Sequence, residues 1–200
     1  MKNKLLIGIG IIAIIGMIFF SLQGNEATYV EQILKEREEK EHFMLTSPSS
    51  PFAENPDTFK GLNYFPPNPD FKVKARIIPS SDKNIVRLGT NDGKQKPYKK
   101  YGYAEFQLGD QLNKLLILEL IERGPLKGTL FLAFGDETSA NETYGAGRYL
   151  DIKKSKSGLL DLDFNLAYNP YCAYSESFSC PFPPAENLLN ISIEAGEKTY

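Results

Sequence analysis

The densest run of polar side chains that could do chemistry lies in the stretch FGDETSANETYGAGRYLD, residues 134–151. Carboxylates close to an arginine and to hydroxyl groups could bind a polar ligand, or hold a carboxylate ready for proton transfer. The same residue types could instead form a loop held by internal caps and a salt bridge. The candidate ligand-binding residues of this stretch are Asp136, Thr138, Glu142, Tyr144 and Arg148.

A second candidate segment follows at residues 165–174 and is rich in tyrosine and asparagine. Tyrosine rings offer a flat amphipathic surface, and the Arg148 guanidinium suits a carboxylate or phosphate on a ligand. We expect the segments near 140 and 170 to meet at one rim of the fold and to bind a small polar or anionic ligand. The candidates from the second segment are Asn165, Tyr168, Asn169 and Tyr174.

The chain has two cysteines, Cys172 and Cys180, in a stretch with several prolines. Three states are open: a disulfide, two buried free thiols, or a reactive or metal-binding pair. We favour the disulfide, whose short loop would stabilise the fold by roughly 2–3 kcal/mol. The spacing is not CxxC, and His42 is the only histidine, so a thioredoxin-type motif and a Cys/His zinc site are both disfavoured. We predict no metal.

We also predict no cofactor and no nucleic-acid partner. Gly145 and Gly147 lack the third glycine of a dinucleotide-binding fingerprint, and the next segment reads as a strand. A formal net charge of −2 gives no general field that would attract nucleic acid. The hydrophobic content of 42% is enough for a single packed domain.

The amino terminus predicts membrane attachment. Residues 5–22 form an uncharged apolar run behind a short tail, residues 1–4, that carries two lysines. Eighteen helical residues can span a hydrocarbon core of roughly 30 Å. A cleaved signal peptide is the alternative, but small residues are poorly placed for cleavage. We expect an uncleaved anchor in the lipid bilayer of a cell membrane, with the body facing outward because the lysines stay inside.

Beyond the anchor, the pattern predicts a helical stalk at 28–45 and a single β domain at 46–200. Residues 46–71 are rich in proline and read as an extended connector. From residue 72, alternating apolar and polar residues separated by glycine and aspartate turns indicate an antiparallel barrel or sandwich of seven or eight strands. The expected strands lie within residues 71–78, 84–89, 98–108, 111–122, 128–136, 147–152, 158–168 and 187–197.

The stretches FGDETSANETYGAGRYLD, LDFNLAYNPYCAYSESFSCPFPPAENLL and IEAGEK together resemble a bacterial family of uncharacterised proteins, a domain of unknown function. The resemblance covers roughly residues 45–200 and implies no catalytic role, because no activity is established for the family. It includes members without an export segment, for which packed thiols would serve as well as a disulfide. Beyond the nine candidates and the two cysteines, its motif positions are Tyr149, Pro181 and Asn187.

Three functions are compatible with these observations. The first is a membrane-tethered module that binds a small polar or anionic ligand. The second is an envelope scaffold that presents a β surface to another protein. The third is a hydrolase or transferase in which Glu142 or Asp136 is the general base and Arg148 stabilises charge.

Overall fold

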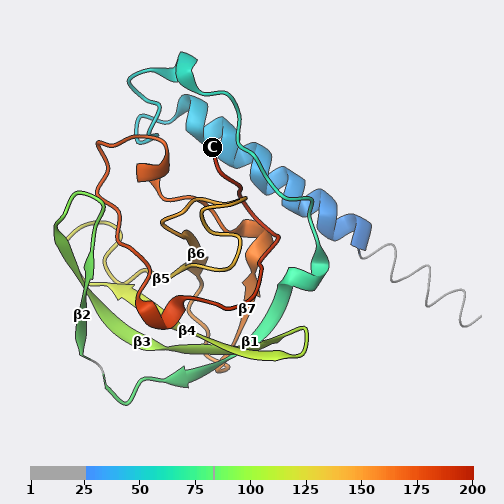
Figure 1. Ribbon diagram of the computed structural model, residues 1–200, viewed down its shortest axis with the longest axis vertical. Helices are drawn as coiled ribbons and strands as arrows, with labels where there is room; N and C mark the ends of the chain where they lie inside the picture. The colour runs from blue at the N-terminus through green and yellow to red at the C-terminus, as the bar shows by residue number, and fades with distance from the viewer. Residues whose placement is uncertain (1–25, 83) are drawn as a thin grey trace, which may run out of the picture.

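The computed structural model describes residues 26–82 and 84–200. A helix occupies residues 26–46, and an antiparallel sheet of seven strands follows it. The helix lies across one side of the curled sheet, and the carboxyl terminus ends beside it (Figure 1). The strands are β1 (Lys72–Pro79), β2 (Ile85–Gly89), β3 (Gln95–Leu108), β4 (Gln111–Leu120), β5 (Leu130–Phe134), β6 (Arg148–Ile152) and β7 (Leu159–Asp163).

The sheet is a curled half-barrel, not the closed barrel or the sandwich that the sequence pattern predicted. Its strand order is β6-β5-β4-β3-β1-β7, with β2 paired to β3 outside this path. The order leaves β6 and β7 as the two end strands. Every pairing is antiparallel, and four of the six pairs join strands that are neighbours in sequence. The predicted antiparallel class is therefore confirmed, while the predicted closure is wrong.

Alternation along the strands produces two hydrophobic clusters, one on each face of the sheet. In β4, Leu115 and Ile117 join the larger cluster, whereas Leu116 and Leu118 join the smaller one. Successive side chains of a strand point to opposite faces, so a strand covered on both sides reads as a continuous apolar run. This explains why residues 115–118, which by composition suit a helix, form a strand.

The helix at residues 26–46 packs along the body and is more than a stalk. Ile33 and Met44 are buried, and the Tyr29 hydroxyl donates a hydrogen bond of 2.8 Å to Asp163. Arg37 donates to the carbonyl of Phe65 at 2.9 Å. These contacts hold one face of the helix against the domain. Lys40 and Glu41 are half-buried, while the other charged side chains of the helix apart from Arg37 stay exposed.

The last predicted strand, residues 187–197, does not form. This segment is irregular and makes two isolated bridges, from Leu188 to Gly135 and from Glu197 to Tyr64. Its carbonyl groups at Ile193 and Ala195 accept hydrogen bonds from the Arg148 side chain. These carbonyls accept from the guanidinium, whereas those of a strand accept from the amides of a neighbouring strand.

Within residues 26–82 and 84–200, no helix combines the length and the apolar character that a membrane crossing needs. The predicted anchor at 5–22 lies outside the described residues and stays a prediction.

Candidate functional site

Arg148, the central candidate from the sequence, is completely buried. Its guanidinium forms an ion pair with Asp136, with 2.8 Å between Nη2 and Oδ2, and donates to the carbonyls of Ile193, Ala195 and Glu197. Burial lowers the pKa of the Arg148 guanidinium, and the attraction of Asp136 works against that shift. A ligand arriving from solvent cannot reach this group. Arg148 is therefore a structural residue that connects Asp136 to the carboxyl-terminal segment.

The rest of the 136–144 loop divides into an inner and an outer part. Thr138 is buried and donates to Asp136 at 2.5 Å, which completes a closed cluster with Arg148. Glu142 is exposed, on the rim of a small polar hollow beside Lys198. Tyr144 turns towards the cysteines: burial and then the neighbouring Cys172 raise the pKa of Tyr144 to about 12.

Three fully buried asparagines use their side chains to join backbone segments. Asn165 accepts from the amide of Asn68 and donates to its carbonyl, both at 2.8 Å. Asn187 accepts from the amide of Leu116 at 2.7 Å and donates to the carbonyls of Leu116 and Ala133. Leu116 and Ala133 would face each other two positions beyond the last β4–β5 pair, Leu118 and Phe131, so the Asn187 amide replaces a missing rung of the ladder.

A buried carboxylate, Glu197, connects the helix to the 169–174 segment. It accepts hydrogen bonds from the Asn169 side chain at 3.0 Å and from the Tyr174 hydroxyl. Lys40, on the helix, forms an ion pair with Glu197 at 2.7 Å. Gly196 precedes it at a φ of +78°, and a Cβ there would lie 2.6 Å from the carbonyl oxygen of Phe164. Only glycine fits, because both the φ value and the close backbone exclude a side chain.

Tyr149, next to Arg148 on β6, faces the opposite side of the sheet and enters a cavity of about 610 Å³. Its ring packs edge-to-face against Phe131 and Tyr168, with centroids 5.6 and 6.0 Å away. Seven aromatic side chains line this cavity, and aliphatic side chains and prolines supply most of the remaining wall. The seven are Phe43, Tyr98, Phe131, Tyr149, Tyr168, Tyr171 and Phe178.

One end of the cavity is polar. The Tyr168 hydroxyl donates to Asp151 at 2.8 Å, and the Lys40 ammonium lies 4.6 Å from the centre of the Tyr168 ring. Burial lowers the pKa of Lys40, and Glu197 works against that shift. Among the described residues, the only hydrogen bond that the Lys40 ammonium donates goes to Glu197, so further donor capacity remains at this end.

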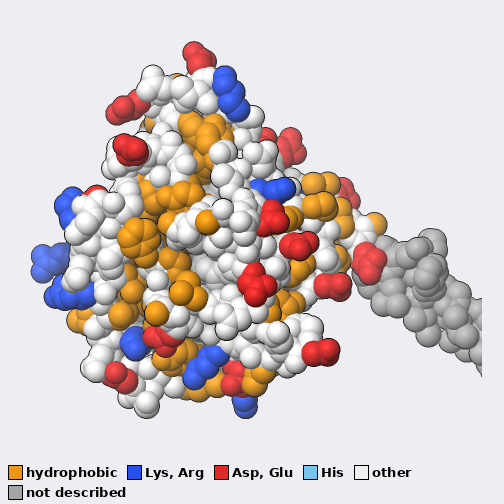
Figure 2. Space-filling view, in the orientation of Figure 1, with side chains coloured by type: hydrophobic (Ala, Val, Ile, Leu, Met, Phe, Trp, Pro, Cys, Tyr) orange, Lys and Arg blue, Asp and Glu red, His pale blue; other side chains and the backbone are white. Residues whose placement is uncertain are grey.

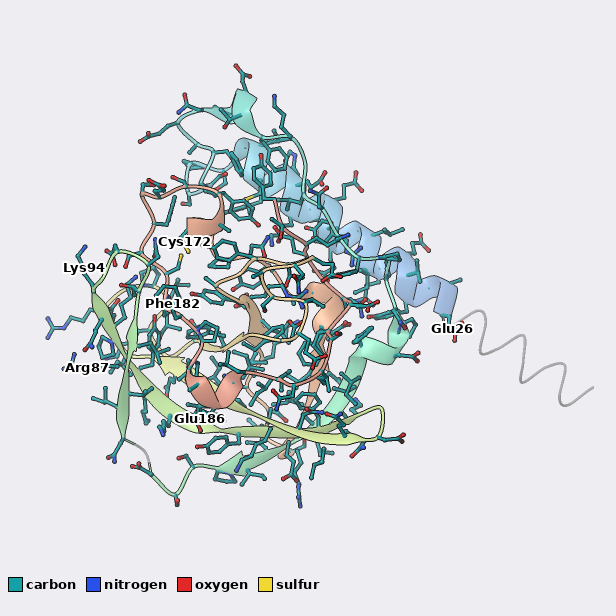
Figure 3. The ribbon with its side chains drawn as sticks, viewed as in Figure 1. Glu26, Arg87, Lys94, Cys172, Phe182 and Glu186 are labelled. Carbon is teal, nitrogen blue, oxygen red and sulfur yellow. The ribbon has the colours of Figure 1, made fainter. Side chains whose placement is uncertain are left out.

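Cys172 and Cys180 are free thiols in this structure, so the expected disulfide is not formed in it. The two residues are nevertheless in contact, because the Cys172 amide donates to the Cys180 sulfur at 3.2 Å. Cys180 lines the aromatic cavity. Figure 3 shows Cys172 on the inner side of its loop, while Arg87 and Lys94 point outward from the β2–β3 hairpin. Figure 2 shows hydrophobic side chains gathered across the middle of the same face.

The structure therefore divides the candidates by location. Asp136, Thr138 and Arg148 form one closed cluster, and Asn169 and Tyr174 meet at Glu197. Tyr168 is the candidate that lines the cavity. The polar segments near 140 and 170 do meet, through a bridge between Tyr149 and Tyr168.

Sequence reasoning missed the helix's contribution to this cavity. Lys40, Phe43 and Met44 all line it, although the charged run around Lys40 predicted a solvated face. The available signal was spacing: Ile33, Arg37, Lys40 and Met44 recur every three or four residues, which places them on one helical face. Arg and Lys can belong to such a face, since their long stems pack on apolar surface.

Comparisons with known proteins agree with this fold. Residues 57–198 match the family described as Protein of unknown function (DUF1684). The chain is also similar to the solution NMR structure of an uncharacterized protein from gene locus rrnAC0354 of Haloarcula marismortui. The two are 34% identical, with 88% of this chain and 96% of that chain covered and a TM-score of 0.65. No curated protein matches.

The resemblance to an uncharacterised family is thereby confirmed, while its bacterial origin and the individual motifs stay predictions. The matched region spans more than half of the sequence, and the solved relative is matched over nearly its full length. The chain belongs to the DUF1684 family of proteins of unknown function.

Proposed function

We propose that this domain binds an uncharged, ring-containing apolar small molecule in the cavity beside β6. The observation that supports the proposal is the lining of the cavity: seven aromatic rings around about 610 Å³. A volume of this size falls in the range of small-molecule sites, which combine apolar walls with a few polar groups. Aromatic side chains favour planar partners, because rings stack in offset or edge-to-face geometry.

The charges at the polar end favour a neutral ligand over the anionic one expected from the sequence. The positive charge of Lys40 is already balanced by Glu197 at 2.7 Å. Asp151 adds a negative charge and accepts from Tyr168. With no surplus positive charge, this end offers an anion no net attraction. The spare Lys40 donors suit a carbonyl or ether oxygen on an otherwise apolar molecule.

The proposal includes attachment to a membrane. Residues 5–22 supply the anchor by sequence, and the lysines before them orient the β domain outward. The helix at 26–46, which follows the anchor, contributes Lys40, Phe43 and Met44 to the cavity wall. An anchored domain would keep this cavity close to the bilayer, where apolar molecules concentrate.

Photolabelling of the purified full chain with benzophenone, an uncharged molecule with two rings, tests the binding proposal. Adducts are expected on peptides that carry Phe131, Tyr149 or Phe178. The Leu126→Glu variant places a carboxylate on the cavity wall and should reduce these adducts at least fivefold, since a charge beside an apolar ligand is poorly solvated. Leu126 is 62% exposed, so the substitution should not disturb folding.

Leu112→Glu is the matched control, because Leu112 is equally exposed, at 68%, and does not line the cavity. This variant should label like the natural chain. Adducts spread evenly over the surface, and equally in both variants, would contradict the proposal and favour the envelope scaffold. The hydrolase alternative has no support in the geometry, because Asp136 is held by Arg148 and Glu142 lies outside the aromatic cavity.

A further inference from the structure

The two cysteines occupy different environments although they touch. Cys180 is 8% exposed and forms part of the cavity wall. Its sulfur accepts the Cys172 amide at 3.2 Å, and the Cys172 thiol donates to it as well. The backbone amide of Tyr171 is a further donor. Several donors directed at one sulfur stabilise the thiolate over the thiol.

The consequence is an asymmetric pair of thiols. The Cys172 thiol, and after it the Cys172 and Tyr171 amides and the charge of Lys96, lower the pKa of Cys180 to about 7, against the opposing effect of burial. Cys172 shifts the other way: its hydrogen bond to Cys180, burial and the repulsion of a neighbouring thiolate all raise its pKa. The hydrogen bonding of the pair therefore favours a thiolate on Cys180 over a thiolate on Cys172.

Other titratable groups that face Cys180 do not change this assignment. Lys96 is the cation near it, and its ammonium donates to the Ser179 carbonyl at 2.6 Å. The remaining groups are tyrosines whose own pKa values are raised first by burial, so they stay neutral near pH 7 and place no negative charge beside the sulfur. They are Tyr98, Tyr144, Tyr149 and Tyr168.

We propose that Cys180 and Cys172 form a thiol–disulfide exchange couple in the wall of the cavity, with Cys180 as the attacking thiolate and Cys172 as the resolving thiol. The substrate class is a disulfide, R–S–S–R. The Cys180 thiolate attacks one sulfur of the substrate, so a mixed disulfide forms and one thiolate, RS⁻, leaves. Cys172 then loses its proton to a departing thiolate and attacks the Cys180 sulfur. The second RS⁻ leaves, and the protein holds a 172–180 disulfide.

The roles follow from position. Cys180 can meet a substrate through the cavity, whereas Cys172 needs only to reach the sulfur that it already contacts. Exchange rates are highest when the attacking thiol has a pKa near the ambient pH. At pH 7, a thiol of pKa 7 is half ionised, about fiftyfold more than a thiol of pKa 9. After allowing for its weaker intrinsic nucleophilicity, it should react about fivefold faster.

The experiment treats the reduced full chain with glutathione disulfide at pH 7 and maps the products by mass spectrometry. The natural chain should end as the 172–180 disulfide with no retained glutathione. Cys172→Ala should stop at a glutathione mixed disulfide on Cys180. Cys180→Ala should form its mixed disulfide on Cys172 about fivefold more slowly than the natural chain reacts, because the favoured thiolate is gone.

Two results would overturn the proposal. A Cys180→Ala variant that reacts as fast as the natural chain would remove Cys180 from the attacking role, and a stable mixed disulfide on the natural chain would remove Cys172 from the resolving role. Iodoacetamide alkylation supplies a second readout: the rate at Cys180 should rise with a midpoint near pH 7 in the natural chain. In Cys172→Ala that midpoint should move upward, because the thiol donor is lost. An unchanged midpoint would contradict the proposed hydrogen bond.

Folding defects are separated from these effects by Cys180→Ser and Cys172→Ser, whose urea midpoints should match the natural chain. The couple does not depend on the proposed ligand. If benzophenone fails to label the cavity while exchange proceeds as described, the binding proposal fails alone. If labelling succeeds and exchange does not occur, only the thiol couple is wrong.

Discussion

The two faces of β6 show opposite uses of polar side chains. On one face, Arg148 is completely buried and its two terminal nitrogens donate to a carboxylate and to three carbonyls. On the other, Tyr149 looks into a cavity of about 610 Å³ whose polar end keeps unused donors on Lys40. Arg148 therefore stabilises the fold while Tyr149 lines the cavity, although the two are adjacent in sequence, because successive side chains of a strand point to opposite faces.

This difference shows how to separate a structural polar residue from a functional one. Asn165, Asn187 and Arg148 satisfy backbone groups of distant segments and have no solvent exposure. Replacing such a residue leaves a buried backbone group without its partner, which costs about 1–3 kcal/mol. These positions can therefore be as distinctive in the sequence as catalytic ones. A site needs polar atoms with capacity left over, next to open volume.

The largest expected effect on stability is on the face of β6 that carries Arg148. Arg148→Ala should lower the free energy of unfolding by about 3–5 kcal/mol, because it leaves Asp136 buried without its partner. Urea denaturation of the full chain measures this. The double variant Arg148→Met with Asp136→Leu should recover part of the loss, since no buried charge remains. A loss below about 1 kcal/mol for Arg148→Ala would mean that the guanidinium is free for a ligand after all.

A smaller loss is expected at Asn187. Asn187→Ala removes three hydrogen bonds and leaves the Leu116 amide and carbonyl buried between β4 and β5. We expect the free energy of unfolding to fall by about 2–3 kcal/mol, measured again by urea denaturation. Asn113→Ala is the control on the same strand, because its side chain is only half-buried and donates an exposed hydrogen bond to the nearby Gln111 carbonyl; this change should alter the free energy of unfolding by no more than about 0.5 kcal/mol. Equal losses would show that Asn187 does not replace a ladder rung.

The smallest effect on stability is expected at Lys40, which pairs with Glu197 and also lines the cavity. Lys40→Met removes the cation from Glu197 but keeps the apolar stem. We expect the free energy of unfolding to fall by about 1–2 kcal/mol. This is less than for a fully buried pair, because the Lys40 side chain is 25% exposed. The control Lys35→Met breaks an exposed pair with Glu39 and should change stability by less than about 0.5 kcal/mol. Benzophenone labelling should change in Lys40→Met and not in the control. If Lys40→Met is as stable and as strongly labelled as Lys35→Met, Lys40 does not connect the helix to the cavity.

Much of the sheet was predictable from local pattern. The alternation of Val73, Ala75 and Ile77 placed these residues on one face, and all three belong to the larger core cluster. The turns at residues 91–93 and 109–110 lie where the sequence predicted them, with Gly93 and Gly109 at positive φ. Local geometry decided these features, since period-two alternation and turn chemistry act over a few residues.

The site was predictable only in part. The two segments were correctly expected to meet, but the ligand chemistry inferred from Arg148 does not fit its burial. Nothing in residues 134–151 alone distinguishes an arginine that faces solvent from one that faces a core. The decision came from residues 193–197, which are far away in sequence and whose carbonyls accept hydrogen bonds from both terminal nitrogens of the guanidinium.

By itself, the sequence determined an antiparallel β domain, the positions of seven of the eight strand segments it predicted, and a family relationship without an activity. It also predicts the membrane anchor. Only the tertiary structure decided that the sheet stays half open, that the helix closes one side of the cavity, and that the Cys180 sulfur accepts a hydrogen bond from the Cys172 amide. Burial and hydrogen-bond saturation depend on segments brought together from across the chain, and local sequence does not encode those encounters.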